Sequence, residues 1–275
     1  MTLVTSDFEY IRELVFRRTS IVLETGKEYL AVTRLDPIRR NLGMSSLAEL
    51  IVALRSDPLS PLHDEVAEAM TTNETSFFRD GHPWESLLTD VIPDLIERNK
   101  GSRTLRIWSA GCATGQEPYT VAMLLREHFA ALVNTWAVQI LATDVSATVL
   151  MQAKEGRYGQ LEVNRGLPVR LLVKYFHQDG IHWYIDDSIR SMVVFERQNL
   201  FSSTWAPPPM DIVLLRNVTI YFSESGKNET IKRVSTALRP RGWLLLGASE
   251  TALHLDASLQ RTPIGKTMWY RKETG

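Results

Sequence analysis

The hydrophobic pattern of the chain changes near residue 70. Before that point apolar residues recur with helical spacing, as in Phe8, Ile11 and Val15, and no segment shows the alternation of a strand. Residues 57–65 interrupt the pattern with two prolines, which are expected to end one helix and precede the next. Residues 1–70 are therefore predicted to form an all-helical domain.

Residues 71–275 instead alternate short apolar runs with helical segments. Each run is short enough for one buried strand, and the runs are TLRIWSAG, AVQILATD, DIVLLRN and GWLLLGAS. Strands that alternate with helices predict a parallel sheet covered by helices, which is the α/β class.

An alternating segment interrupts this α/β pattern within residues 168–195. Ile181, Trp183 and Ile185 alternate with polar residues, and Asp179-Gly180 is a favoured two-residue hairpin turn. We predict a small antiparallel hairpin here. It either covers the sheet edge as a lid or docks a peptide as an added strand.

Composition and charge narrow the class of protein. With 44% hydrophobic residues, the 275-residue chain can bury a full core, and a net charge of -1 does not favour a nucleic-acid partner. Cys112 is the only cysteine, which excludes an internal disulfide and fits a reducing compartment. The N-terminus carries early charges, and no segment approaches the ~20 apolar residues of a membrane span. We expect a cytoplasmic protein without membrane insertion.

Small and polar residues follow the predicted strands, at the edge where open α/β sheets bind ligands. Residues 109–115 are small, so backbone could approach a ligand there, but they lack the complete G-x-G-x-x-G of a nucleotide site. Asp144 ends the second strand and could accept hydrogen bonds from a ribose. Helix capping is the alternative, although Ser146 is at least as well placed to cap.

The strand before residue 216 delivers a further polar group to the same rim. Arg216, Asn217 and Tyr221 follow the four apolar residues 212–215 within DIVLLRNVTIYF. A salt bridge of Arg216 and packing of Tyr221 beneath the next helix are the structural alternatives.

In their order and spacing, several segments resemble the CheR family of bacterial chemotaxis receptor methyltransferases. These segments are TNETSFFRD, WSAGCATGQEPYTVAML, LATDVSATVLMQAKEGRY, FERQNL and LLRNVTIYF. The resemblance implies a class I, Rossmann-like methyltransferase domain that binds S-adenosylmethionine, with an inserted β-subdomain and an N-terminal helical domain. It also implies methylation of glutamate carboxylates on the cytoplasmic domain of membrane chemoreceptors, which yields methyl esters and S-adenosylhomocysteine.

The resemblance assigns roles to individual residues. Residues 72–80 would cross from the helical domain and close over the cofactor, anchored by Phe77 and Phe78. Asp144 would contact the ribose. The implied cofactor contacts are Asn73, Thr75, Arg79, Glu117, Asp144, Asn199, Leu200, Arg216 and Asn217. Thr219 departs from the family pattern, which has a bulkier residue there.

Arg79 and Tyr221 are the expected catalytic residues. A glutamate carboxylate has a reference pKa of ~4.3, so it is already ionised at neutral pH and needs no general base. A guanidinium and a phenol could orient it, although Arg79 could equally serve the cofactor carboxylate. No metal is expected, because the six histidines lack metal-ligand spacing.

Lys27, Arg34, Arg39 and Arg40 could steer the helical domain onto an acidic receptor face, and a solvated helix face is the alternative. A regulatory adaptor is a possible further partner. Two rival functions remain: a noncatalytic S-adenosylmethionine-binding regulatory module, and a nicotinamide-dependent reductase. The reductase would need a fuller glycine turn, and the regulatory module would be expected to lack Arg79 or Tyr221.

Overall fold

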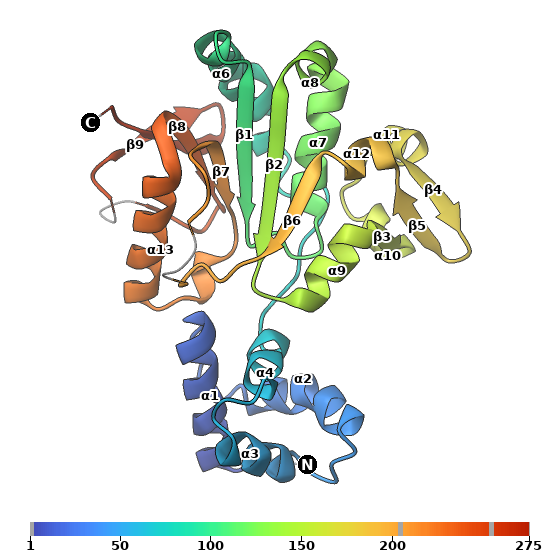
Figure 1. Cartoon of the computed structure of the whole chain (residues 1–275), viewed down its shortest axis with the longest axis vertical. Coiled ribbons are helices and arrows are strands. Elements are labelled where there is room, and N and C mark those ends of the chain that lie inside the picture. The colour runs from blue at the N-terminus through green and yellow to red at the C-terminus, as the bar shows by residue number, and fades with distance from the viewer. Residues whose placement is uncertain (1–2, 203–205, 253–255, 275) are drawn as a thin grey trace.

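The computed structural model describes residues 3–202, 206–252 and 256–274, and it shows a helical domain at the carboxyl edge of an α/β domain (Figure 1). The predicted all-helical pattern is confirmed. Ile11, Leu35 and Leu50 are fully buried in a core shared by the helices. These helices are α1 (Thr5–Thr19), α2 (Glu28–Asn41), α3 (Leu47–Ser56) and α4 (Leu62–Ala69).

The α/β domain is built on a sheet with the strand order β6–β2–β1–β7–β8–β10–β9. Strands β6, β2, β1, β7 and β8 run parallel, whereas β10 is antiparallel to both of its neighbours. The parallel sheet predicted from the apolar runs is confirmed. The strands are β1 (Thr104–Ala110), β2 (Ala137–Asp144), β6 (Val193–Arg197), β7 (Met210–Leu215), β8 (Leu238–Leu246), β9 (Leu259–Ile264) and β10 (Thr267–Lys272).

Alternate residues of the central strands enter cores on opposite faces of the sheet. Ile107 of β1 joins the core formed with α6 and α7, and the next residue, Trp108, joins the core formed with α13. Helices therefore cover both faces. The helical elements of this domain are α5 (His82–Ser86), the π-helix η1 (Leu87–Val91), α6 (Ile92–Asn99), α7 (Gln116–His128), α8 (Ala130–Thr135), α9 (Ala147–Glu155), α12 (Asp187–Arg190), the 3-10 helix η2 (Thr219–Tyr221) and α13 (Glu224–Ala237).

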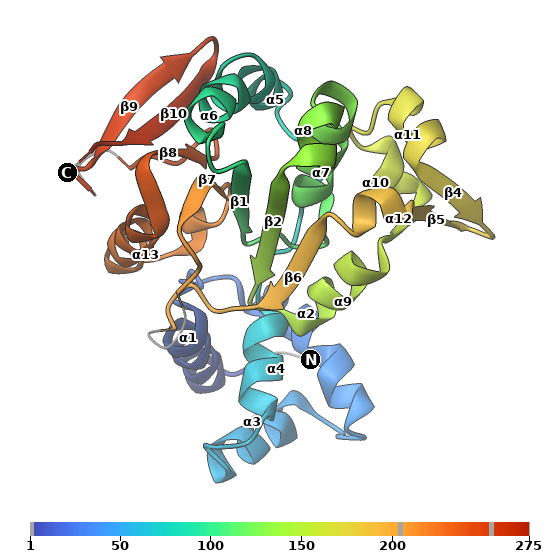
Figure 2. The same ribbon diagram turned by 45° about the horizontal axis from the view of Figure 1, so that its top comes forward.

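A separate antiparallel sheet projects beside β6 and α9 (Figure 2). It contains the predicted hairpin, formed by β4 (Phe176–Asp179) and β5 (His182–Ile185), and adds β3 (Arg157–Gly159), which precedes the predicted insert. Helices α10 (Gln160–Asn164) and α11 (Val169–Tyr175) lie between β3 and β4.

The hairpin turn lies one residue later than predicted. Asp179 pairs with His182 in the strand ladder, so the connecting residues are Gly180, with φ 56°, and Ile181. Ile181 is therefore exposed at the tip rather than alternating into the sheet.

Glu127 at the end of α7 attaches α11 of this subdomain to α7. Its carboxylate accepts a hydrogen bond from the Tyr175 hydroxyl at 2.6 Å and pairs with Lys174 at 2.5 Å and with Arg170 at 2.7 Å. The hydrogen bond from Lys174, followed by that from Tyr175, lowers the pKa of Glu127 to about 2. In the ranges that the structure describes, no helix combines the length and apolar character needed to cross a membrane.

This attachment predicts a pH-dependent stability difference. Because the pKa of Glu127 is lowered, its stabilising effect is present above the unfolded value of about 4.5 and is lost as the pH falls toward about 2. Glu127→Gln should lower the urea midpoint at pH 7, and the difference from wild type should shrink below about pH 4.5. Denaturation curves of both proteins across this range measure it, and a difference that does not change with pH would contradict the assignment.

Candidate active site

A pocket of about 910 Å³ lies between the helical domain and the carboxyl edge of the sheet. Thr19 and Ile21 reach it from the helical domain, and Gly111, Cys112 and Ala113 reach it from the turn after β1. All ten residues predicted for the cofactor and for catalysis line this pocket: Asn73, Thr75, Arg79, Glu117, Asp144, Asn199, Leu200, Arg216, Asn217 and Tyr221.

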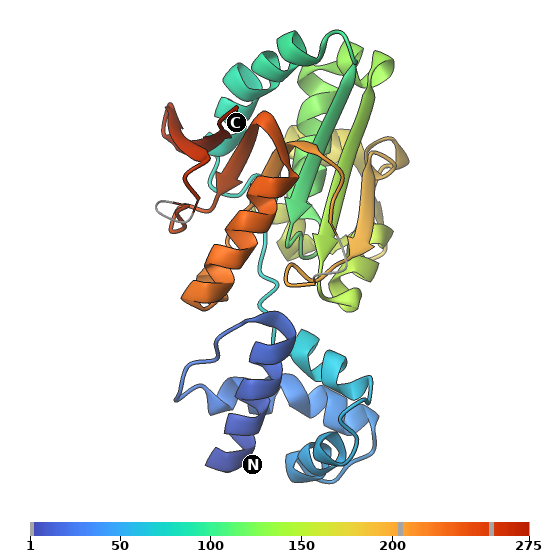
Figure 3. The ribbon, with the colours of Figure 1, turned by 60° about the vertical axis from the view of Figure 1, so that its left-hand side comes forward.

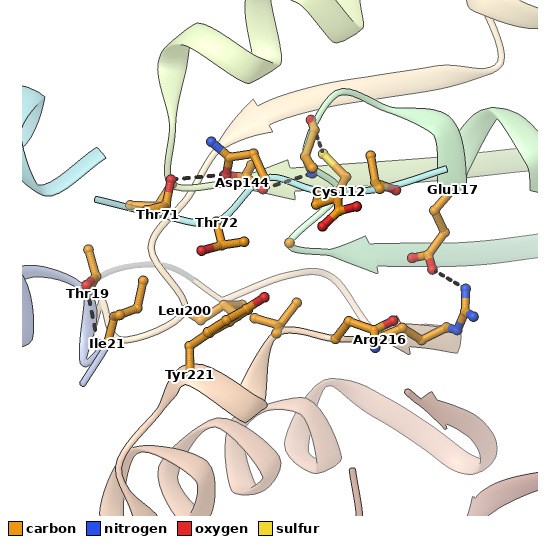
Figure 4. A pocket seen from close by; sticks show the side chains of 18 of the residues that line it. Thr19, Ile21, Thr71, Thr72, Cys112, Glu117, Asp144, Leu200, Arg216 and Tyr221 are labelled. Atoms are coloured by element: carbon orange, nitrogen blue, oxygen red, sulfur yellow. Dashed lines mark hydrogen bonds and ion pairs between the residues drawn. The ribbon is translucent and has the colours of Figure 1, made fainter. Parts of the chain in front are cut away.

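The side chains occupy distinct walls of the pocket (Figure 4). Asp144 and Cys112 lie on one side, and Leu200 and Tyr221 lie on the opposite side. A ligand between these walls would therefore meet a carboxylate on one side and a phenol on the other.

The turn after β1 needs its small residues for close packing. Gly111 has φ 75°, and a Cβ atom there would lie 2.5 Å from Cγ2 of Val218 in the loop after β7. The backbone N–H groups of Gly111 and Cys112 donate to the Thr143 carbonyl at 2.8 and 2.9 Å. These contacts bring the ends of β1, β2 and β7 together at the pocket.

Asp144 is held in the pocket wall by backbone donors. Its carboxylate accepts hydrogen bonds from the N–H groups of Ala113 at 2.9 Å and Ser146 at 3.0 Å. Ser146 also caps α9 through its hydroxyl, which accepts from the N–H of Val149. Ser146, rather than Asp144, therefore caps α9. Burial raises the pKa of Asp144 despite the opposing effect of the backbone N–H groups.

Arg216 is a buried cation with carboxylates on two sides. Its side chain is 2% exposed and donates to Glu117 at 2.9 Å and to Asp80 at 2.7 Å. It also donates to the Arg79 carbonyl at 3.1 Å and lies 5.1 Å from the ring centre of Trp84. The sequence interpretation included a salt bridge of Arg216 but did not identify Asp80 or Trp84, although Asp80 ends the segment TNETSFFRD.

Asn217 adopts a left-handed backbone conformation with φ 59°. Its N–H donates to the carboxylate of Glu250 at 2.6 Å, a residue that the sequence interpretation missed. Among the described residues, Asn217 Oδ1 and Arg216 Nε are buried without a hydrogen-bond partner. A polar ligand in the adjoining pocket would supply hydrogen-bond partners for these atoms.

Residues 71–80, here called the crossing, run from α4 to the α/β domain as extended chain followed by a turn (Figure 3). Phe77 is fully buried and packs edge-on against Tyr158 and Phe176 of the β-subdomain at 5.1 and 5.6 Å, which confirms it as an anchor. The Phe78 N–H donates to Thr120 of α7 at 3.2 Å. Arg79 donates to the Glu74 carbonyl at 3.1 Å.

Asn199 connects the pocket to the helical domain. Its amide donates to the Arg18 carbonyl at 2.6 Å and its side-chain oxygen accepts from the Phe201 N–H at 2.9 Å. Asn73 has a comparable local contact, because its side-chain oxygen accepts from the Thr71 hydroxyl at 3.0 Å. Both side chains are therefore held in place at the pocket rim.

The arginines predicted for receptor recognition lie outside the pocket. Arg34 donates to the carbonyls of Met70 and Thr71 at 2.7 and 3.0 Å, so it holds the start of the crossing. Arg39 pairs with Asp36 at 2.8 Å. Arg40 also pairs with Asp36 but has a side chain that is 71% exposed. Of these arginines, Arg40 is the one most open to a partner.

Comparison with known proteins identifies related chains. The description "CheR methyltransferase, all-alpha domain" matches residues 6–71, and "CheR methyltransferase, SAM binding domain" matches residues 73–267. Chemotaxis protein methyltransferase Cher2 of Pseudomonas putida is 41% identical over 247 residues, which are 89% of this chain and 90% of that protein. Chemotaxis protein methyltransferase 1 of Pseudomonas aeruginosa is 39% identical over 274 residues, which are 98% of this chain and 99% of that protein.

The doubly wound sheet and the matched domain define a class I methyltransferase that uses S-adenosylmethionine (SAM). Its helical N-terminal domain and small separate sheet complete the predicted fold class. The chain belongs to the CheR methyltransferase family of chemotaxis proteins. The resemblance seen in the sequence is confirmed, and the reductase and the noncatalytic module are not favoured.

The pocket residues fit S-adenosylmethionine. Asp144 ends β2 with a carboxylate that suits ribose hydroxyls, and Gly111 allows the backbone close approach. The unpartnered Asn217 Oδ1 can accept a hydrogen bond from a ligand amine. The individual contacts stay predictions.

Asp144→Ala tests the ribose assignment. Loss of a buried hydrogen-bonding partner should weaken S-adenosylmethionine binding by roughly 1 to 3 kcal/mol, measured by titration calorimetry. Ser146→Ala is the matched control, because Ser146 caps α9 but does not line the pocket. The control should lower thermal stability and leave the dissociation constant unchanged. Equal affinities of Asp144→Ala and wild type would refute the assignment.

Proposed function

We propose that the protein transfers the methyl group of S-adenosylmethionine to glutamate side chains on the cytoplasmic domains of chemoreceptors. The products are glutamate methyl esters and S-adenosylhomocysteine. One observation supports this reaction above others: a guanidinium and a phenol, those of Arg79 and Tyr221, line the pocket, and Tyr221 lies opposite the wall that carries Asp144. The names of the curated relatives give the chemotaxis context.

The reaction requires no general base from the protein. When bound, S-adenosylmethionine supplies a methyl group activated by a sulfonium. A glutamate carboxylate is ionised at neutral pH, so an oxygen lone pair can form the new C–O bond while the methyl–sulfur bond breaks and its electrons remain on sulfur. No proton has to be removed, which agrees with a pocket whose described lining residues include Arg79 and Tyr221 and no histidine.

The main task of the protein is then to orient the substrate carboxylate toward the methyl group. A guanidinium can hold a carboxylate through parallel hydrogen bonds, and a phenol can add another from a different direction. In-line alignment of reacting groups can contribute up to ~7 to 11 kcal/mol to catalysis. We assign this orientation to Arg79 and Tyr221, with Arg79 also able to bind the cofactor carboxylate.

Exclusion of water falls to the crossing segment and the helical domain. Thr71 and Asn73 from the crossing, and Thr19 and Ile21 from the helical domain, line the same pocket as Asp144. A covered site keeps water from competing with the carboxylate and strengthens the hydrogen bonds that hold it.

The overall assignment can be tested directly on receptors. Purified protein is incubated with methyl-labelled S-adenosylmethionine and receptor-containing membranes. We expect label on the receptor that base releases as methanol, the behaviour of a carboxyl methyl ester. Label that resists base, or no label on any receptor while the protein binds the cofactor, would refute glutamate methylation.

Tyr221→Phe separates orientation of the substrate from cofactor binding. The variant keeps the ring and loses one hydroxyl, so kcat should fall by roughly tenfold, the effect of losing about 1.4 kcal/mol, while cofactor affinity changes little. Tyr184→Phe is the control, because this ring stacks on His177 in the β-subdomain. Transfer at the wild-type rate by Tyr221→Phe would return Tyr221 to a packing role.

Arg40→Glu tests the proposed receptor surface. If Arg40 meets an acidic receptor face, reversal should raise KM for the receptor severalfold, and the effect should weaken as salt shortens the screening length below ~8 Å. Arg17→Glu on α1, where the side chain is 73% exposed, is the matched reversal that should leave KM unchanged. An unchanged KM for Arg40→Glu at low salt would show that α2 presents only a solvated face there.

A further inference from the structure

The carboxylate of Glu250 is surrounded by donors from the loops after β7 and β8. Its Oε2 atom accepts from the N–H groups of Asn217 at 2.6 Å and Gly247 at 2.7 Å. Its Oε1 atom accepts from the N–H groups of Val218 at 3.0 Å and Thr219 at 2.7 Å, and from the Thr219 hydroxyl at 2.8 Å.

Three consecutive N–H groups of residues 217–219 point at one side chain because Asn217 has the left-handed φ of 59°. Successive N–H groups arranged this way form a concave site that attracts an anion. Here the chain fills that site with its own carboxylate. A carboxylate has about four lone-pair sites, so these donors occupy Glu250 fully and leave it no capacity for a substrate.

The contact also requires a close approach of the two loops. A Cβ atom at Gly247 would lie 2.7 Å from Glu250 Oε2 and 2.9 Å from the Asn217 backbone nitrogen. Only glycine leaves room for this arrangement. Thr219 supplies the additional hydroxyl donor.

The loop that Glu250 holds carries the pocket groups. Arg216 precedes it, Asn217 is its first residue, and Tyr221 follows through η2, with its N–H donating to the Val218 carbonyl at 3.3 Å. Movement of residues 217–219 would therefore displace Asn217 and the Tyr221 ring together.

We infer that Glu250 is a positioning residue for methyl transfer, because it fixes the loop that aims Asn217 and Tyr221 into the pocket. The inference rests on the proposed function for the role of Tyr221. Without the carboxylate the three N–H groups lose their acceptor, and the left-handed conformation of Asn217 loses its support.

Glu250→Gln is the first test. A glutamine amide keeps the shape but offers one acceptor oxygen, so its NH₂ group faces either the Asn217 and Gly247 donors or the Val218 and Thr219 donors. Losing the hydrogen bonds to one of these pairs of donors corresponds to roughly a 10- to 100-fold change in rate. We therefore expect kcat to fall by that factor. Glu229→Gln on the exposed side of α13 is the control and should retain wild-type kcat.

A double-mutant cycle separates positioning from general stabilisation. If Glu250 acts through Tyr221, Glu250→Gln should slow the wild type strongly and slow Tyr221→Phe much less. Active protein is counted by the stoichiometry of S-adenosylhomocysteine binding. Fully additive effects, or a loss of rate explained by fewer binding-competent molecules, would overturn the inference.

Hydrogen exchange tests the same inference without a methyl-accepting substrate. The amides of residues 217–219 should be protected in the wild type and should exchange at least about tenfold faster in Glu250→Gln, with core strands β1 and β2 unchanged. Unchanged exchange at 217–219 would overturn it. A wild type that shows this protection but methylates no receptor would instead count against the proposed function alone.

Discussion

The site depends on the ion pairs that the buried guanidinium of Arg216 makes. This guanidinium joins the end of β7 to Glu117 at the start of α7 and to Asp80 at the end of the crossing. Removing one partner from a buried ion pair costs roughly 3–5 kcal/mol, because the remaining charge is left uncompensated. This cost applies to Glu117, which is 12% exposed, whereas the pair with Asp80, which is 34% exposed, is screened by solvent and contributes less. The crossing is therefore held against the sheet by electrostatics as well as by the apolar anchor of Phe77. Glu117 is in turn fixed by the Ser109 hydroxyl at 2.8 Å.

The helical domain forms part of the pocket. Glu68 of α4 accepts from the N–H of Ala147 at 2.9 Å, at the start of α9, and pairs with Arg197 at 2.5 Å. Ile21 forms a backbone bridge with Phe222, directly after Tyr221. A negative side chain at a helix N-terminus is favoured by the helix dipole. These contacts fasten the helical domain to the ends of β2 and β6 and to the β7 loop, so both domains shape the pocket.

The sequence predicted what depends on local pattern. Apolar runs indicated the strands, and the position of Asp144 at a strand end indicated its place in the pocket. Residues whose importance arises from distant partners were missed. Asp80 meets Arg216 across 136 positions, and Glu250 meets Asn217 across 33. In the sequence, both read as ordinary charged residues in loops.

The arginines of α2 are a second case in which the sequence could not predict which residues are committed to distant partners. A row of basic residues on α2 predicts a charged surface, and nothing local distinguishes Arg40 from Arg34. The structure distinguishes them, because the guanidinium of Arg34 is committed to the backbone of residues 70 and 71. A guanidinium has enough donors to satisfy several carbonyls, so the crossing can begin at a helix end without leaving those groups unpaired.

Arg79 and Tyr221 are supported in different ways, and this difference bears on their proposed roles. Tyr221 follows a loop fixed by Glu250, whereas Arg79 belongs to the crossing and donates to the Glu74 carbonyl of the same segment. The guanidinium is thus delivered by the segment that covers the pocket, and the phenol is delivered by the sheet. A carboxylate that must meet both groups can be aligned only when the crossing is seated. Under the proposed function, closure over the cofactor and orientation of the substrate would therefore depend on the same contacts, those that Asp80 and the Arg79 carbonyl make with Arg216.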